Sequence, residues 1–339
     1  MRKFLEKVIN QENLRIEEMK EAAKSCFNEQ ISDSELAAFL IALRAKGETP
    51  EEIAGLAEII RSESSQKSNR LTNVMDNCGT GGDGSYSFNI STTAAFVIAG
   101  AGVTVAKHGN RSISSKTGSA DVLEHLGISL TFQKEQMEEI LHENNIAFLY
   151  APNIHQGMKR FMKVRQDLRI PTVFNLIGPL TNPVTLDTQF VGVYRRDMLP
   201  MIAETMHRLG RRRAIAINGA GYMDEASLAG ENHLSLLNEG KVTNFTIHPS
   251  ELDLPVYPNE KIRGGNAEEN ADILLRVLNG KPGPYYDTVL LNAGLGLYAN
   301  GIAQTMKSGI DMARESIASG AALEKLHRLA DYSKKILVG

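Results

Sequence analysis

Apolar residues in the first 62 positions recur every three or four residues, which predicts amphipathic helices and no strands. Two capping boxes mark helix starts, at Ser32-Asp33-Ser34-Glu35 and Thr49-Pro50-Glu51-Glu52. The pattern fits four short helices, so we expect a small all-helical N-terminal domain at residues 1–68. Residues 62–70 carry no apolar side chain, which is typical of the linker that would end such a domain.

From residue 71 onward, short apolar runs alternate with longer amphipathic stretches. Runs typical of strands lie at 71–75, 103–106, 147–150, 190–194, 214–217 and 288–292. Stretches typical of helices lie at 91–101, 118–126, 134–144, 199–209 and 268–278. This alternation predicts an α/β domain with a mostly parallel central sheet, and we place it at residues 71–339.

Two further helical segments depart from the alternation. Residues 156–168 are amphipathic, and we expect the segment around 156–180 to pack back on the N-terminal helices. The C-terminal part, 299–337, is helical again. Its predicted buried side consists of Ile302, Met306, Ile310, Ala313 and Ile317.

Composition restricts the function more than the fold. The net charge is −3, so the chain has no overall positive field to attract nucleic acid. The two cysteines, Cys26 and Cys78, lie far apart, which favours a reduced cytoplasmic protein without disulfides. We see neither a secretory signal nor an apolar run of membrane-spanning length. These features argue against nucleic-acid or membrane binding.

A glycine-rich stretch at residues 76–92 connects the first strand-like run to an apolar helix. Its glycines are Gly79, Gly81, Gly82 and Gly84. A strand, a glycine loop and a helix N-terminus together present backbone N–H groups to a phosphate. Asp83 within the loop repels phosphate, and a carboxylate beside polyphosphate implies a bridging divalent cation. We therefore predict a metal–phosphate site.

A second polar stretch, residues 107–116, follows the next strand-like run and would lie where ligands bind in open α/β sheets. Lys107 and Arg111 would neutralise phosphate charge. Asn110, Ser114 and Ser115 would hold ribose and phosphate oxygens. A solvated loop is the alternative, which we favour less because two such loops follow successive strands.

Asp224-Glu225 follows a strand-like run that ends in glycines. Two adjacent carboxylates in a loop can serve one or two magnesium ions. The same pair would equally suit the acidic first turn of a helix. The residues themselves leave both interpretations open.

A third candidate is the stripe of His155, Met158, Met162 and Arg165, which share one face at helical spacing. The two methionines are more simply core residues. Arg165 at the end of the stripe suits a substrate carboxylate. A histidine in such a place is more often structural than catalytic, so His155 is the weaker candidate.

Taken together, these motifs resemble the anthranilate phosphoribosyltransferase family. The matching segments are 78–83, 89–92, 107–115, 118–124, 174–183, 224–225, 264–271 and 291–294. The resemblance implies transfer of a phosphoribosyl group from 5-phosphoribosyl 1-diphosphate to anthranilate, the second step of tryptophan biosynthesis. It also implies Mg²⁺, two ions per subunit, and a homodimer formed through the helical domain.

The resemblance also implies roles for individual residues. Those that would hold phosphoribosyl diphosphate are Gly79, Gly82, Asp83, Ser87, Asn89, Ile90, Ser91, Thr92, Lys107, His108, Gly109, Asn110, Arg111, Ser112, Ile113, Ser114, Ser115 and Ser119. Those that would contact anthranilate are Gly79, Asn110, His155 and Arg165, with His108 and His155 lining its path. The magnesium residues would be Ser91, Asp224 and Glu225. We assign no covalent catalyst.

Three departures from the family pattern concern the acceptor side. They are Arg169-Ile170-Pro171-Thr172, Asn77 and Gln156-Gly157. Two rival functions deserve a test. A pyrimidine-nucleoside phosphorylase shares the fold, but the glycine loop and Asp224-Glu225 favour magnesium diphosphate. A nucleic-acid-binding relative would be expected to lose the phosphate loops, which this chain keeps.

Overall fold

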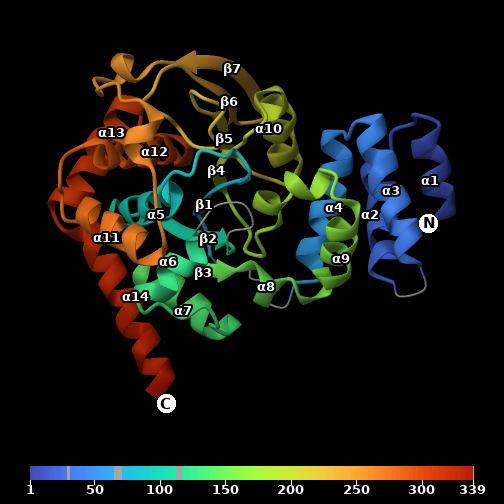
Figure 1. Cartoon of the computed structure of the whole chain (residues 1–339), viewed down its shortest axis with the longest axis horizontal. Helices are drawn as coiled ribbons and strands as arrows, with labels where there is room; N and C mark the ends of the chain where they lie inside the picture. Colours follow the sequence, from blue (N-terminus) through green and yellow to red (C-terminus); the bar gives the residue numbers. More distant parts are fainter. Residues whose placement is uncertain (29–30, 65–70, 112–116, 339) are drawn as a thin grey trace.

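The computed structural model describes residues 1–28, 31–64, 71–111 and 117–338, with only the backbone of residues 337 and 338. Figure 1 shows a helical bundle beside a larger part built around a sheet. The bundle contains α1 (Arg2–Ile9), α2 (Ile16–Phe27), α3 (Asp33–Lys46), α4 (Pro50–Ser62) and, from later in the chain, α9 (Lys159–Leu168). The four helices predicted from the first 62 residues are confirmed.

Both predicted capping boxes form. Ser32 and Thr49 each accept a hydrogen bond from the backbone N–H three residues on. The glutamate at that position, Glu35 or Glu52, accepts in turn from the backbone N–H of the serine or threonine. Glu52 is almost fully buried and also accepts from Lys46 Nζ and from the backbone N–H of Leu14, both at 2.9 Å. One carboxylate therefore joins the start of α4 to the end of α3 and to the loop before α2.

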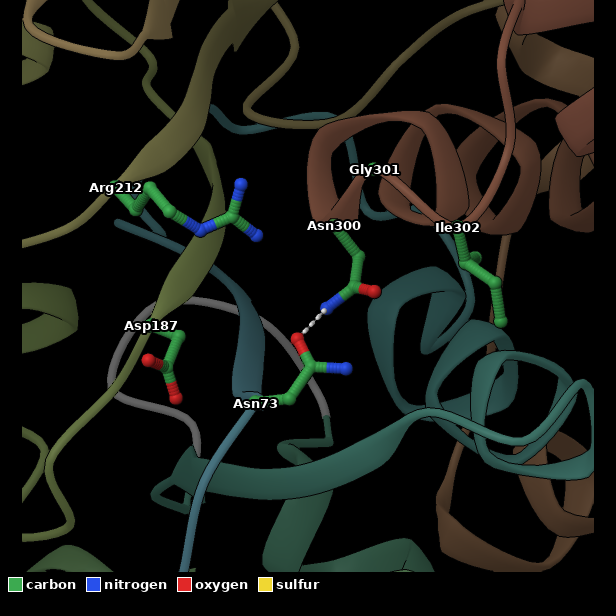
Figure 2. A pocket seen from close by; sticks show the side chains of 6 residues that line it. All are labelled: Asn73, Asp187, Arg212, Asn300, Gly301 and Ile302. Carbon is green, nitrogen blue, oxygen red and sulfur yellow. Dashed lines mark hydrogen bonds between the residues drawn. The ribbon is translucent and has the colours of Figure 1, made fainter.

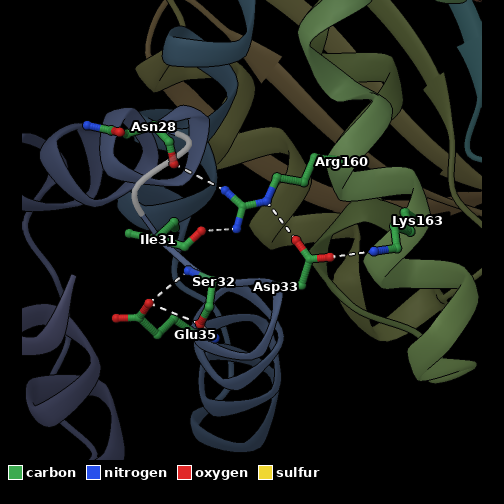
Figure 3. Close-up of polar contacts among 7 residues, drawn as sticks. All are labelled: Asn28, Ile31, Ser32, Asp33, Glu35, Arg160 and Lys163. Atoms are coloured by element: carbon green, nitrogen blue, oxygen red, sulfur yellow. Dashed lines mark hydrogen bonds and ion pairs between the residues drawn. The ribbon is translucent and has the colours of Figure 1, made fainter.

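Helix α9 is attached to the bundle by charge and by apolar packing. Asp33, at the start of α3, accepts from Arg160 Nε at 2.8 Å and from Lys163 Nζ at 2.7 Å (Figure 3). Arg160 also donates to the backbone carbonyl of Ile31. Phe161 of α9 is buried in the same core as the bundle helices. The start of α9 thus lies at a defined place on α3.

The sheet has seven strands in the order β3-β2-β1-β4-β5-β6-β7. The strands are β1 (Val74–Gly79), β2 (Thr104–Gly109), β3 (Ile146–Tyr150), β4 (Thr188–Gly192), β5 (Arg213–Asn218), β6 (Asn232–Asn238) and β7 (Lys241–Ile247). The pairs among β1 to β5 are parallel, whereas β6 and β7 are antiparallel additions. The predicted α/β fold with a mostly parallel sheet is confirmed.

Helices cover both faces of this sheet. The remaining α-helices are α5 (Ile90–Gly100), α6 (Ser119–His125), α7 (Lys134–Asn144), α8 (Ala151–Ile154), α10 (Leu199–Arg208), α11 (Ala267–Leu278), α12 (Pro284–Asn300), α13 (Met306–Ala318) and α14 (Ala321–Val338). Short 3-10 helices are η1 (Gln156–Met158), η2 (Val173–Asn175), η3 (Gly178–Thr181), η4 (Arg196–Met198), η5 (Pro249–Leu252) and η6 (Asn259–Ile262). The two faces of the sheet contribute to two different hydrophobic cores.

Alternate strand residues enter these two cores. Phe190 and Ile215 pack with α5, α12, α13 and α14. Val191 and Ala216 point to the other face and join α10 and the helical bundle. The core of the bundle is therefore continuous with one face of the sheet.

Two expectations are wrong, and one pair of strands was missed. Residues 288–292 are not a strand but lie within α12, whose mid-section is buried all round and so lacks an amphipathic period. Ile302 is 43% exposed beyond the end of α12 and is not on a buried side. The β6–β7 hairpin was not predicted, because β7 is an edge strand with mostly exposed positions.

Candidate active site

The predicted phosphate residues gather at the carboxyl ends of β1 and β2 and at the N-terminus of α5. Gly79 ends β1, Gly109 ends β2, and Ser91 lies in the first turn of α5. The sequence-based strands were too short, since β1 and β2 each extend to these glycines. Lys107 and His108 therefore belong to β2 and are buried, and they do not lie in a solvated loop.

Asp76, a residue of β1, links this strand to β2 and to Asn182 through hydrogen bonds. It is fully buried and accepts hydrogen bonds from the backbone N–H of His108 at 3.2 Å and from Asn182 Nδ2 at 3.0 Å. Asn182 Nδ2 also donates to the carbonyl of Ala106 at 2.8 Å. Burial raises the pKa of Asp76, while Lys107 and Asn182 oppose the shift. Asp76 and Asn182 were missed as site residues, although Asn182 lies in the glycine- and proline-rich turn that the sequence marks as rigid.

Asp224 and Glu225 lie in a loop against the ends of three strands, which excludes the helix N-terminus interpretation. A methyl group on Gly192 at the end of β4 would come within 1.5 Å of the Asp224 carbonyl oxygen. One on Gly79 would come within 2.3 Å of Asp224 Oδ2. Only glycine at these two strand ends leaves room for the acidic segment.

This close approach brings the acidic pair to the glycine loop. The backbone N–H of Gly81 donates to Asp224 Oδ2 at 2.6 Å, and the N–H of Asp224 donates to Asp83 Oδ2 at 3.3 Å. The N–H of Ser91 donates to Glu225 Oε1 at 3.2 Å. The three carboxylates predicted from separate motifs therefore share one site.

The ammonium group of Lys107 brings a positive charge close to these carboxylates. Lys107 is 3% exposed, and its Nζ donates to the carbonyl of Asn77 at 2.5 Å and to Ser91 Oγ at 3.3 Å. Burial raises the pKa of Glu225 to about 7, against the attraction of Lys107. Burial raises the pKa of Asp224 well above its usual value, and repulsion from Asp83 and Glu225 adds to the shift.

This excess of buried negative charge fits a divalent cation, which would favour the ionised carboxylates. Among residues 1–28, 31–64, 71–111 and 117–338, no three His, Cys, Asp or Glu side chains are placed to hold one ion. Mg²⁺ needs no such cluster, because it keeps waters and takes phosphate oxygens beside one or two carboxylates. Ser91, Asp224 and Glu225, which the sequence predicts as magnesium residues, lie together at this edge of the sheet.

The remaining donor-side residues are distributed around this centre. Asn89 precedes α5, and its buried Oδ1 has no hydrogen-bond partner among the described residues. Ile90 and Thr92 are buried in the first turn of α5. Ser87 pairs with Arg263 in an isolated bridge. Gly82 and Asp83 lie in the loop itself, and Ser112, Ile113, Ser114 and Ser115 fall outside the described residues.

Arg111 lies apart from the carboxylate site. Its guanidinium donates to Asp121 at 2.5 Å and to Glu124 at 2.8 Å, both on α6. Ser119 Oγ donates to the carbonyl of Asn110 at 3.2 Å, which ties the start of α6 to the end of β2. These contacts occupy Arg111 with protein carboxylates.

The rings of the buried His108 and the half-buried His155 meet edge to face, with centres 5.3 Å apart. Burial lowers the pKa of His108 to about 3, with a further contribution from His155. Burial also lowers the pKa of His155 to about 4. The Thr181 backbone lies near the His155 ring, but within the described part of the chain neither ring nitrogen has a hydrogen bond of proper geometry. Both histidines are therefore neutral at pH 7.

Arg165 lies on α9, on the bundle side of this pair. Its Nη1 lies 3.4 Å from Met162 Sδ, and its guanidinium lies 5.8 Å from the centre of the Phe174 ring. Burial lowers its pKa. The expected continuous stripe is wrong, because α8, η1 and α9 divide the segment. Met158 and Met162 are only half-buried, and the core side chains of α9 are instead Phe161 and Val164.

A cavity of about 400 Å³ lies at the opposite, amino edge of the strands (Figure 2). Its lining consists of Asn73, Asp187, Arg212, Asn300, Gly301 and Ile302. None of the predicted site residues is among them. The candidate site is thus confined to the carboxyl edge.

Comparisons with known proteins agree with this geometry. The family model described as "Glycosyl transferase family, a/b domain" matches residues 71–323, and the corresponding "helical bundle domain" matches residues 2–64. The anthranilate phosphoribosyltransferase of Exiguobacterium sibiricum is 59% identical over 339 residues, all of both chains. The chain belongs to the anthranilate phosphoribosyltransferase family.

Solved structures of the anthranilate phosphoribosyltransferase family have the same fold. The Thermus thermophilus protein matches with a TM-score of 0.92 and 39% identity, over 98% of this chain and 99% of that one. The Saccharomyces cerevisiae protein in complex with PRPP and Mg matches with a TM-score of 0.82 and 30% identity, over 94% and 92%. The same yeast protein in complex with 4-fluoroanthranilate matches with a TM-score of 0.82 and 29% identity, over 94% and 91%.

No helix within the described part of this family member is both long and apolar enough to cross a membrane.

Replacing Gly192 with alanine tests how closely the acidic segment approaches β4 in this anthranilate phosphoribosyltransferase family member. The added methyl group would overlap the Asp224 carbonyl, so we expect Gly192→Ala to lower the free energy of unfolding by about 1–3 kcal/mol. Gly230→Ala is the control, since its methyl group would meet only Ala220 Cβ at 3.6 Å. Urea unfolding measures both. Equal stability of the two variants would contradict the close approach.

The lowered pKa values of His108 and His155 predict how the free energy of unfolding depends on pH. Their folded pKa values of about 3 and about 4 lie below the unfolded value of about 6.5. In that window the unfolded chain binds more protons, so stability falls as the pH drops below about 6.5. From pH 6.5 to 5, each histidine contributes at most about 2 kcal/mol of this loss.

We expect the unfolding midpoint temperature to fall less between pH 7 and 5 in His108→Gln than in the wild type. The exposed His142 serves as the control, and His142→Gln should follow the wild type. A His108→Gln profile parallel to that of the wild type would contradict a lowered pKa of His108 in the folded protein.

Proposed function

We propose that this chain transfers the 5-phosphoribosyl group from 5-phosphoribosyl 1-diphosphate to the amine of anthranilate. The products are N-(5-phosphoribosyl)anthranilate and diphosphate, the second step of tryptophan biosynthesis from chorismate. The observation that carries the proposal is the meeting of Asp224 and Glu225 with the glycine loop and Lys107, in a member of this family.

The donor would occupy the carboxyl edge of β1 and β2. The residues proposed to hold it are Gly79, Gly82, Asp83, Ser87, Asn89, Ile90, Ser91, Thr92, Lys107, His108, Gly109, Asn110, Arg111, Ser112, Ile113, Ser114, Ser115 and Ser119. Backbone N–H groups at the start of α5 and the Lys107 ammonium would bind phosphate oxygens. To do the same, Arg111 would have to leave Asp121 and Glu124.

Magnesium would be held by Ser91, Asp224 and Glu225, beside Asp83. When bound, Mg²⁺ supplies positive charge that neutralises the departing diphosphate. Support comes from Asp224 and Glu225, whose pKa values are raised by burial and further by repulsion from Asp83, so a bound cation would favour their ionised forms. Support also comes from the yeast relative in complex with PRPP and Mg. Two ions per subunit remain our prediction.

The acceptor would lie between the sheet edge and α9. Gly79 and Asn110 would contact it from the strand ends, and Arg165 would bind its carboxylate. His108 and His155 would line its path. The yeast relative in complex with 4-fluoroanthranilate supports an aminobenzoate such as anthranilate as the acceptor.

Catalysis would rest on positioning and charge. The bond between the ribose anomeric carbon and diphosphate breaks, and its electron pair leaves with the diphosphate. Lys107 and the loop N–H groups stabilise that charge. The anthranilate nitrogen attacks the opposite face and then loses a proton. Because an aromatic amine is uncharged at pH 7, no strong base is needed before attack, which agrees with two histidines whose lowered pKa values make them weak bases.

We also propose that the chain forms a homodimer through its helical domain and acts in the cytoplasm. Ile9 of α1 is 60% exposed, which leaves an apolar side chain on the bundle surface. Sedimentation at several concentrations would measure the assembly. A monomer at all of them would contradict the dimer.

The direct test mixes the protein with anthranilate, phosphoribosyl diphosphate and Mg²⁺ and follows the loss of anthranilate fluorescence. We expect loss that requires all three components. Phosphorolysis of uridine or thymidine, measured in parallel, would instead indicate a nucleoside phosphorylase. No fluorescence loss would contradict the proposed function.

Neutralising either metal carboxylate should weaken the response to magnesium. We expect Asp224→Asn and Glu225→Gln to raise the Mg²⁺ concentration for half-maximal activity by about tenfold or more, because each removes one charge-assisted ligand. Circular dichroism should show that both variants fold. An unchanged Mg²⁺ titration would remove these residues from the metal site.

Arg165 should affect the acceptor and spare the donor. We expect Arg165→Ala to raise the KM for anthranilate by about tenfold or more, since it removes a charged hydrogen bond to the carboxylate. The KM for phosphoribosyl diphosphate should change by less than about twofold, because Arg165 would not contact this substrate and distant sites act nearly independently. The reverse pattern would place Arg165 at the donor.

A further inference from the structure

The turn that carries Asp224 and Glu225 is unusually tight. Directly after β5, the backbone N–H of Gly219 donates to the carbonyl of Met223 at 2.9 Å, so the chain reverses within five residues. Gly221 has a φ of 81° and Tyr222 a φ of 63°. A tyrosine with positive φ is uncommon and adopts it only where neighbouring contacts hold it.

Asn218 is the first of those contacts. It is fully buried at the end of β5, and its Nδ2 donates to the carbonyls of Val193 at 2.8 Å and Met223 at 3.3 Å. Its Oδ1 accepts from Arg196 Nε at 3.0 Å. The Arg196 bond therefore fixes which way the amide faces, and with it both carbonyl contacts.

Arg196 makes a second contact with the same turn. Its guanidinium lies 4.6 Å from the centre of the Tyr222 ring, in cation–π geometry. Tyr222 is 59% exposed, so this stacking is a principal restraint on its side chain. Among the contacts of the described residues, Arg196 has no carboxylate partner, whereas the neighbouring Arg195 is paired with Asp197 at 2.5 Å.

Arg196 thus contacts the turn at both of its ends, through Asn218 and Tyr222. Tyr222 lies two residues before Asp224, the first of the two carboxylates. We propose that Arg196 is a positioning residue for the magnesium carboxylates, acting through Asn218 and Tyr222. The inference rests on the proposed function for its kinetic consequence. Its structural consequence, a turn restrained by Arg196, does not depend on any activity.

The surroundings of Arg196 favour a test by substitution. Tyr194, Arg195, Arg196, Asp197 and Tyr222 line an open cavity of about 460 Å³. A truncated side chain there is replaced by water and leaves no void in the core. The cavity adjoins the glycine loop, since the backbone N–H of Tyr194 donates to Thr80 Oγ1 at 3.2 Å.

The kinetic experiment compares Arg196→Ala with Arg195→Ala, a matched loss of a neighbouring arginine. We expect Arg196→Ala to raise the half-saturating Mg²⁺ concentration and the KM for phosphoribosyl diphosphate by about tenfold, the order of one lost ion-assisted contact. The KM for anthranilate should stay within about twofold of the wild type. Arg195→Ala should leave all three unchanged.

Two further variants separate positioning from general damage. Arg196→Lys keeps a cation over Tyr222 but loses the planar Nε bond, so it should recover part of the Mg²⁺ response. Tyr222→Phe keeps the ring and should match the wild type. An Arg196→Ala enzyme with the wild-type Mg²⁺ and phosphoribosyl diphosphate dependence would overturn the inference.

Amide hydrogen exchange of residues 219–226 supplies a readout that needs no turnover. Exchange should be faster in Arg196→Ala than in the wild type or Arg195→Ala. If the wild type transferred no phosphoribosyl group, the proposed function would fail, and exchange alone would decide the inference. Equal exchange in the three proteins would overturn it.

Discussion

The contact between the Asp224 backbone and the glycines that end β1 and β4 is the constraint on which the site depends. No side chain fits at Gly79 or Gly192 without overlapping Asp224. The approach places a carboxylate within hydrogen-bonding distance of the Gly81 N–H and next to Asp83. Glycine is therefore required at these strand ends for room, as well as in the loop for conformational freedom.

Burying so many polar groups costs stability, and the structure offsets that cost with hydrogen bonds. Asp76 is satisfied by Asn182 and by the His108 backbone, and Lys107 by the carbonyl of Asn77. Asp224 and Glu225 are less well compensated, because burial raises the pKa of both and repulsion from Asp83 adds to the shift. Carboxylates perturbed in this way are typical of functional sites.

The two proposed substrates would be held by different parts of the molecule. The donor residues belong to the strand ends and α5, whereas Arg165 belongs to α9, which is fastened to α3 through Arg160 and Asp33 (Figure 3). The continuous core between the bundle and one sheet face sets the position of α9 relative to β1. Packing far from the sheet edge would thus determine the distance between the proposed acceptor and donor sites.

The sequence by itself determined the features that depend on neighbours in the chain. Capping boxes marked helix starts, alternation indicated an α/β fold, and the glycine loop with Asp83 indicated a metal–phosphate site. It misjudged α12, because a helix buried all round has no period, and it ended β1 and β2 too early. Local patterns also gave no role to Asp76 or to Arg196. Only the tertiary structure decided that Asp224 meets Gly81, 143 residues away, because strand order brings β1, β4 and β5 together at one edge. Local periodicity carries no information about which strands become neighbours, so the partners across that edge emerge only in the folded chain.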